Sequence, residues 1–316
     1  MSQTRRTSVG RVVSSAMAAL CMGALCTMAL APAAMAGEGC PGSLVDHIPP
    51  HGESSPTGSA FAQQVATLSG SDRDAVIEAA LLAGDLPPFL RHLKPVVLEG
   101  HRARGGTARV LLCVTPDYLA VGSDADYVRV PMGLRPALAI ARSFGFILPT
   151  TTMVDAIYAQ AEVRLAPQPL PAGPQMRSTD YLWRHNGMIR AQRRALGAPL
   201  GRLVAGHKKD LTFTSRLRAM PQRVAIYGWQ QPDGTPIQPL STVHGARYAD
   251  YSHGVRLVSA TAYVDGQARS LYDILEDPDL APIVSREGPI RDAAGLVAAL
   301  GSPPVDEPRE EASMAR

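Results

Sequence analysis

The sequence predicts a mixed α/β (α+β) fold in a single globular domain, built on a mixed or antiparallel sheet. Residues 107–115 are rich in valine and leucine, as a buried strand is. Residues 71–84 and 180–196 instead place apolar side chains at helical spacing. Because strand-type and helix-type segments are interspersed along the chain with turns between them, we place one domain at residues 61–290.

The first 36 residues are typical of a secretory signal peptide. Three arginines precede an apolar run at residues 12–30, and the small-residue ending at 34–36 fits the cleavage rule. We expect cleavage after Ala36, and the pair Arg5-Arg6 also allows the twin-arginine route. The sequence therefore predicts a periplasmic or secreted protein with no stable membrane span after cleavage.

The charge of the chain argues against a nucleic-acid partner. The whole sequence carries a net charge of +3, and residues 1–36 hold three arginines and no acidic residue. The remainder is therefore neutral overall and lacks the positive charge that draws proteins to nucleic acid. About 280 residues remain, which is long enough to bury a core.

Two cysteines remain after the signal segment, Cys40 and Cys113. An even pair in an oxidising compartment predicts a single disulfide. The alternatives are an inert buried thiol and a nucleophilic Cys113. The nucleophile is disfavoured because Cys113 lies within an apolar, strand-like run.

The two ends of the expected domain have different compositions from its centre. Residues 37–60 are rich in Gly, Pro, Ser and His and predict an irregular leader. Residues 291–316 are expected to form a flexible tail, because the last residues are acidic and short of apolar side chains.

Each remaining element follows from a local signal. Ser71 offers a helix cap, Pro136 suits a first helical turn, and Thr150 offers a second cap. Glycines at 105–106 and a Gly-Ser pair at 122–123 mark turns between strands. The expected strands are residues 95–98, 107–115, 223–229, 236–240 and 261–264, and the expected helices are 71–84, 134–144, 153–161, 180–196 and 271–276.

Residues 206–210, Gly-His-Lys-Lys-Asp, form a dense polar run. In a strand, His207 and Lys209 would share one face, and Lys208 and Asp210 the other. One interpretation is that one face of this strand serves a functional site while the opposite face forms a salt bridge. The other reading is a charged sheet edge, on which lysine prevents further strand pairing.

The strand predicted at 223–229 contains Tyr227 and Trp229, which would lie on one face. Core packing is the commoner role of such a pair. An exported polymer-binding protein would instead use the two rings to stack on sugar or peptide units.

The run at 244–253, His-Gly-Ala-Arg-Tyr-Ala-Asp-Tyr-Ser-His, is the strongest candidate site. A zinc hypothesis takes His244, Asp250 and His253 as metal ligands, with an open position for water. Zinc is therefore one candidate cofactor, and the sequence does not decide whether it is bound.

A metal-free hypothesis uses the same run for proton transfer. His244 or His253 would act as general base, oriented by Asp250. Tyr248 or Tyr251 would act as acid, and Arg256 or Lys209 would hold an anionic group of the substrate.

Three motifs together resemble a family of exported bacterial proteins: Gly-His-Lys-Lys-Asp at 206–210, Val-Ala-Ile-Tyr-Gly-Trp at 224–229, and the run beginning Tyr-Ala-Asp-Tyr-Ser-His at 248. The resemblance spans about residues 85–264. It implies export and one coherent domain, and it implies no particular activity.

We therefore expect an exported hydrolase that acts on a cell-envelope or extracellular polymer, either peptidoglycan or a polysaccharide. The alternatives are a non-catalytic polymer-binding protein and a polysaccharide lyase. The candidate catalytic residues are His207, Lys209, Tyr227, His244, Tyr248, Asp250 and His253. The candidate substrate-binding residues are Trp229, Arg256 and Lys208.

Overall fold

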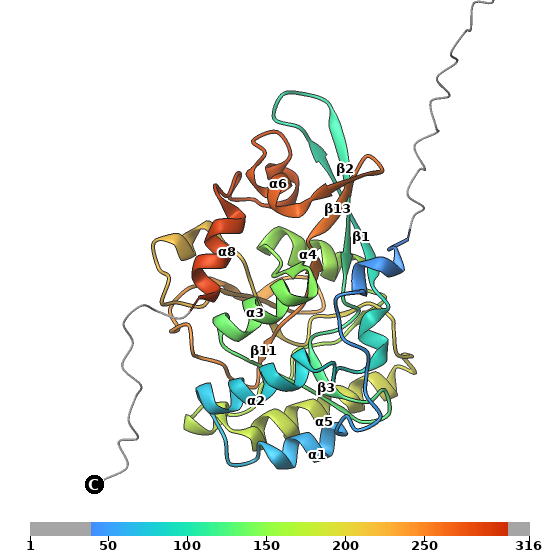
Figure 1. The fold of residues 1–316 in the computed structure, drawn as a ribbon, viewed down its shortest axis with the longest axis vertical. Coiled ribbons are helices and arrows are strands. Elements are labelled where there is room, and N and C mark those ends of the chain that lie inside the picture. The colour runs from blue at the N-terminus through green and yellow to red at the C-terminus, as the bar shows by residue number, and fades with distance from the viewer. Residues whose placement is uncertain (1–38, 303–316) are drawn as a thin grey trace, which may run out of the picture. The chain divides into compact units, whose positions relative to one another are not determined.

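The largest sheet in the described part of the chain, residues 39–302 of the computed structural model, has six strands. Its order is β14-β13-β2-β12-β5, with β1 also paired to β2, and every pairing is antiparallel. Figure 1 shows three of these strands, β1, β2 and β13, close together. The run predicted as a buried strand at 107–115 forms β2, which confirms that prediction. The strands are β1 (Lys94–His101), β2 (Thr107–Val114), β5 (Phe146–Ile147), β12 (Val258–Ser259), β13 (Thr261–Val264) and β14 (Gln267–Ser270).

A second sheet, of order β10-β9-β8-β11, brings the two polar runs together. The strands β8 (Lys209–Leu211) and β11 (His253–Gly254) run parallel, so His253 pairs with Lys209. The other two strands are β9 (Ile226–Gln230) and β10 (Pro236–Ser241). Two smaller pairings join β3 (Ala120–Gly122) to β4 (Tyr127–Arg129), and β6 (Val163–Arg164) to β7 (Val204–Ala205).

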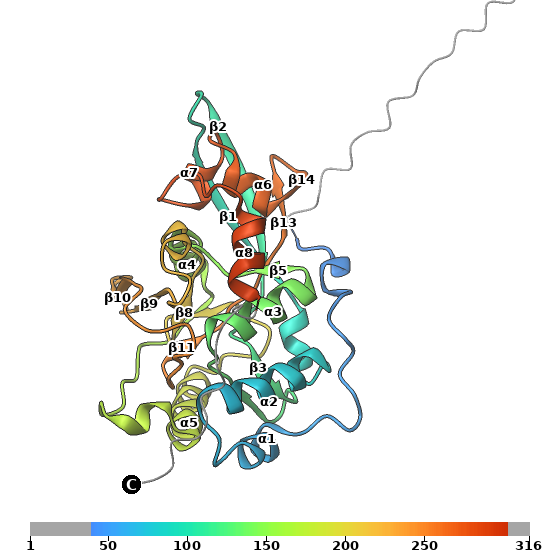
Figure 2. The same ribbon diagram turned by 60° about the vertical axis from the view of Figure 1, so that its left-hand side comes forward.

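Helices flank these sheets. The α4 helix packs against β9, and α2 packs against α3 (Figure 2). The α-helices are α1 (Gly58–Gln64), α2 (Gly70–Leu82), α3 (Leu134–Phe144), α4 (Thr151–Gln160), α5 (Thr179–Ala195), α6 (Leu271–Glu276), α7 (Ala281–Val284) and α8 (Ala293–Gly301). The short 3-10 helices are η1 (Gly42–Val45), η2 (Pro88–Arg91), η3 (Pro174–Arg177) and η4 (Ser215–Arg218).

The helix boundaries follow the capping signals in the sequence. The Thr150 hydroxyl accepts the Met153 N–H at 3.2 Å, which starts α4 as predicted. The α3 helix ends at Gly145, whose φ of 80° is a conformation that glycine adopts readily. At α2 the cap lies at Ser69 instead of Ser71, and no side-chain capping bond forms.

The domain extends further toward the C-terminus than the sequence predicts. A flexible tail was expected from residue 291, but residues 293–301 form the helix α8, which packs against α3 and α6. Leu296 and Val297 are among its buried side chains. The Asp292 carboxylate also accepts the Gly295 N–H at 3.2 Å, which caps the helix. The rest of the expected tail, from residue 303, lies outside the described residues.

The mixed α/β fold class and the disulfide are both confirmed. Cys40 and Cys113 are bonded, with their Cα atoms 5.7 Å apart, which ties the leader to β2. A disulfide is compatible with an exported protein. Within residues 39–302, no helix has the length and apolar character needed to cross a bilayer. The expected signal peptide lies outside the described residues.

Candidate functional site

Three rings of the run at 244–253 pack together: those of His244 and Tyr248, in the loop between β10 and β11, and that of His253, at the start of β11. The rings of His244 and Tyr248 are stacked, with centroids 4.0 Å apart and planes inclined by 10°. The ring of His253 lies edge-on to Tyr248, at 5.6 Å between centroids. A turn that joins the Tyr248 N–H to the Gly245 carbonyl at 2.9 Å places the two stacked rings over each other.

Asp250 connects two of these rings. The Tyr248 hydroxyl donates to Asp250 Oδ2 at 3.0 Å, and His253 Nε2 lies 3.9 Å from the same oxygen. The other carboxylate oxygen accepts the backbone N–H and the hydroxyl of Ser252, at 2.8 and 2.6 Å. Asp250 is buried, so these bonds fix its position and that of the Tyr248 hydroxyl.

The local environment sets the protonation of the cluster. Burial raises the pKa of Tyr248 to about 12, and Asp250 adds to that rise. Burial lowers the pKa of His253 to about 4 and lowers that of His244 below its ordinary value. Burial alone would raise the pKa of Asp250, but the charge of His253 and the Ser252 bonds lower it. At neutral pH the phenol is therefore protonated, the imidazoles are neutral and the carboxylate is ionised.

Lys209 and Trp229 border this cluster. The Lys209 Nζ lies 5.0 Å from the centroid of the Trp229 ring, a cation–π contact. Trp229 has a φ of 59°, a left-handed conformation that is unusual for a bulky residue and marks local strain. Trp229 Nε1 and both ring nitrogens of His253 are buried without a hydrogen-bond partner within residues 39–302.

Tyr227 does not join Trp229 in one aromatic platform. Its hydroxyl donates to the Asp155 carboxylate on α4 at 2.9 Å, and the Arg286 guanidinium lies 5.9 Å from its ring. The positive φ values of Gly228 and Trp229 interrupt the regular alternation of faces on which the prediction depended. Tyr227 therefore belongs to the packing of β9 on α4.

His207 and Lys208 also lie in the interior, although both were predicted at the site. His207 Nε2 lies 3.2 Å from Asp117 Oδ1, and Asp117 also binds Arg129 through two hydrogen bonds, of 3.0 and 2.6 Å. The Lys208 Nζ donates to the Tyr251 carbonyl. Both side chains are fully buried. They therefore stabilise the interior of the fold and do not contribute to an accessible site, contrary to the prediction.

Arg256 is likewise buried. Its guanidinium donates to the carbonyls of Thr115 and Val204, at 2.8 and 2.6 Å, and lies 4.3 Å from the Tyr118 ring. Those bonds connect three segments of the chain. In this structure Arg256 holds the strands together and cannot reach a substrate.

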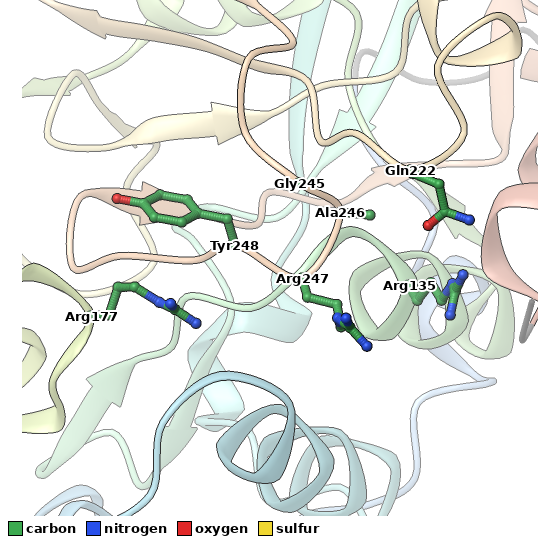
Figure 3. Close-up of a pocket in the computed structure, with 7 residues that line it drawn as sticks. All are labelled: Arg135, Arg177, Gln222, Gly245, Ala246, Arg247 and Tyr248. Carbon is green, nitrogen blue, oxygen red and sulfur yellow. The ribbon is translucent and has the colours of Figure 1, made fainter. Parts of the chain in front are cut away.

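A cavity of about 440 Å³ adjoins Tyr248. Figure 3 shows its side chains along the loop at 245–248, with Arg177 beneath the Tyr248 ring. The Arg177 guanidinium lies 5.6 Å from that ring. The lining residues are Arg135, Arg177, Gln222, Gly245, Ala246, Arg247 and Tyr248.

Sequence reasoning did not place these arginines at the site. Arg177 is the last residue of η3, which follows a proline-rich segment at 165–173. Tyr251 holds this part of the chain through its side chain and its backbone: the Leu170 N–H donates to the Tyr251 hydroxyl at 2.7 Å, and the Tyr251 N–H donates to the Met176 carbonyl at 3.0 Å. Nothing local in the sequence indicates that contact. Of these arginines, only Arg247 lies within the run at 244–253 that the sequence indicated as a candidate site.

The structure offers no metal-binding cluster at the residues considered for zinc. Within residues 39–302, no group of three or more His, Cys, Asp or Glu side chains is arranged to hold a metal ion. His244, Asp250 and His253 instead form the ring and carboxylate contacts given above.

Comparison of the chain with protein-family models, with curated protein sequences and with solved structures finds no match.

Proposed function

We propose that this protein is an exported hydrolase of a cell-envelope or extracellular polymer, with His244 as general base and Tyr248 as general acid. The observation that supports this most strongly is the stacked pair of His244 and Tyr248, of which Tyr248 lines an open cavity. Both side chains are only partly buried, so both can contact a substrate. The supporting residues, Asp250 and His253, lie behind them.

The protonation states of the pair suit acid–base catalysis. The neutral His244 imidazole can take a proton from the attacking water. The Tyr248 phenol holds its proton at neutral pH because its pKa is about 12, so it can donate that proton to the leaving atom as the bond breaks. Both side chains are partly exposed, so solvent water restores the site: the His244 imidazolium releases its proton to water, and the Tyr248 phenolate takes up a proton from water.

The remaining residues act through this pair. Asp250 orients the Tyr248 hydroxyl through the 3.0 Å bond. His253 lies beside Asp250 and is fully buried, so it is a positioning residue. The partly buried Lys209 supplies a positive charge that can stabilise a developing oxyanion.

A polysaccharide lyase is the second candidate, and one observation favours it. Arginines line the cavity beside the acid–base pair. A β-elimination on an acidic sugar requires that the carboxylate be neutralised while a base removes the adjacent proton. The same His244 and Tyr248 would then serve as base and acid without an attacking water.

Product analysis separates these reactions. The purified protein is incubated with peptidoglycan, with a neutral polysaccharide and with a uronic acid polysaccharide. New chain ends without ultraviolet absorbance indicate hydrolysis, whereas new ends accompanied by the absorbance of an unsaturated sugar indicate elimination.

A matched pair of variants links any product to the site. His244→Gln should abolish product formation, and His101→Gln, an exposed histidine on β1, should leave it unchanged. Polymer binding with no new ends from any substrate would refute an enzymatic role and identify a binding protein. An equal loss in both variants would refute the role of His244.

A further inference from the structure

The charged residues that line the cavity beside Tyr248 are all positive. Its lining includes three arginines and no acidic residue. Arg177 is exposed, whereas Arg135 and Arg247 each take part in at least one further interaction within the protein. Gln222 and the loop backbone complete the wall. Guanidinium groups recognise carboxylate and phosphate oxygens with two parallel hydrogen bonds, so this wall suits an anionic group.

The acidic residues near the arginines face another space. Asp74 and Glu78 of α2 line an adjoining cavity of about 280 Å³, which also contacts Arg135 and Arg247. The Asp74 carboxylate already accepts the Gly133 N–H at 2.8 Å. Asp74 and Glu78 therefore do not line the cavity beside Tyr248, although Asp74 interacts electrostatically with Arg177.

A further positive charge lies behind Arg177. The buried Arg73 guanidinium donates to the Arg177 carbonyl at 2.8 Å. This region holds four arginines, Arg73, Arg135, Arg177 and Arg247, and three carboxylates, those of Asp74, Glu78 and the Asp250 that is bonded to Tyr248. The field at the Arg177 end of the cavity is consequently positive.

The loop that forms the cavity is held in place before any ligand binds. The Ala246 N–H donates to the Gln222 carbonyl at 2.9 Å, and the Ala246 carbonyl accepts the Leu134 N–H at 2.8 Å. A Cβ added at Gly133 would lie 2.7 Å from the Ala246 oxygen, so the loop and the start of α3 are in close contact. A fixed site loses little free energy to ordering when a ligand binds.

We infer that this cavity binds a carboxylate or phosphate group of an acidic polymer, through Arg177 and Arg247, with Arg135 at the back. The cavity volume lies within the usual range of about 300–1,000 Å³ for ligand sites. The placement of the bond to be cleaved at His244 and Tyr248 rests on the proposed function, but anion binding itself does not.

Calorimetric titration with defined oligomers tests the inference. The probes are a short oligogalacturonate, its fully methyl-esterified form, and an oligomer of glycerol phosphate. The wild-type protein should bind at least one of the two acidic oligomers and bind the neutral ester much more weakly. The acidic oligomer that binds identifies the anionic group. Equal affinity for the acid and its ester, or no binding of either acidic oligomer, would overturn the inference.

Charge-removing variants locate the site. Arg177→Gln and Arg247→Gln should each weaken binding by about tenfold or more, as expected for a lost charge-assisted hydrogen bond. Arg104→Gln removes the same charge from the exposed turn between β1 and β2 and should change the affinity little. A similar loss in all three variants would mean that only the net charge matters. Thermal unfolding confirms that each variant is folded.

The two proposals fail in different ways. The His244→Gln variant should retain the wild-type affinity for the acidic oligomer. Specific binding without turnover would refute the proposed hydrolase but keep the anion site. Turnover at the same kcat/KM on neutral and acidic polymers, unchanged in Arg177→Gln, would refute the anion site but keep the hydrolase.

Discussion

The imidazole of His244 lies flat on the phenol ring of Tyr248, with centroids 4.0 Å apart and planes only 10° from parallel. The phenol in turn donates to Asp250 at 3.0 Å. This arrangement places a neutral imidazole next to a protonated phenol, and the phenol of Tyr248 lines the cavity that also holds the arginines. The predictions on activity below follow from this pair.

Removal of the Tyr248 hydroxyl should affect turnover more than binding. Tyr248→Phe keeps the ring, and so keeps the stack on His244, but it loses the proton donor. We expect kcat to fall by about 100-fold or more, with little change in KM. Steady-state kinetics on the polymer that is cleaved provide the measurement. Tyr263→Phe on β13 is the control, and a variant Tyr248→Phe with normal kcat would contradict the assignment of the acid.

The pH dependence of kcat/KM should report on His244. Because burial lowers its pKa, the active neutral form should persist below pH 6.5, and activity should fall only at lower pH. Asp250 raises this pKa and Lys209 lowers it. The midpoint should therefore move to lower pH in Asp250→Asn and to higher pH in Lys209→Met. A midpoint that neither variant moves would show that another group titrates.

Trp229 should tolerate glycine better than alanine. Either substitution removes a buried indole, which costs about 3–5 kcal/mol. However, a backbone φ of 59° costs alanine about 1 kcal/mol of conformational strain, whereas glycine adopts this conformation without that cost. Trp229→Gly should therefore have the higher free energy of unfolding of the two in chemical denaturation. Equal stability, or a more stable alanine variant, would show that the backbone relaxes at this position.

Buried His207 should make the protein less stable in acid. Burial lowers its folded pKa to about 4 from 6.5, so the unfolded chain binds more protons between these values. This contribution to the free energy of unfolding is lost as the pH falls through that window. In His207→Asn, the slope of the free energy of unfolding against pH should fall by the amount that corresponds to about one bound proton.

The buried carboxyl of Asp210 should have the opposite effect on stability in acid. Burial raises the pKa of Asp210 to about 7, so the folded state holds the extra proton there, and its contribution has the opposite sign. Asp210→Asn should therefore make the dependence on pH steeper. Denaturation curves measured across the window test both changes, and slopes that shift in the same direction would contradict this assignment.

The disulfide should stabilise the domain substantially. Cys40 and Cys113 are 73 residues apart, and closing a loop of this length in the unfolded chain is worth about 4 kcal/mol in the chain-entropy estimate. The double variant Cys40→Ser, Cys113→Ser should lose most of that free energy of unfolding. Wild-type protein measured with and without a reductant provides the comparison, and an unchanged stability would show that the bond does not constrain the unfolded chain.

The sequence by itself determined the local features of this protein. A proline in the first helical turn and a threonine cap located α3 and α4, and a valine- and leucine-rich run located β2. The even pair of cysteines predicted the disulfide. The run at 244–253 identified His244, Tyr248, Asp250 and His253, which the fold does bring together. These signals suffice because each depends on residues that are close in sequence.

Only the tertiary structure decided which polar residues are accessible at the candidate site. His207 and Lys208 are as polar as Lys209, yet packing against Asp117 and the Tyr251 carbonyl buries both. Arg177 comes to Tyr248 from a distant segment, because the backbone around Tyr251 holds that segment in place. Periodicity and capping act over a few residues, whereas burial and charge at a site depend on contacts between segments far apart in the chain.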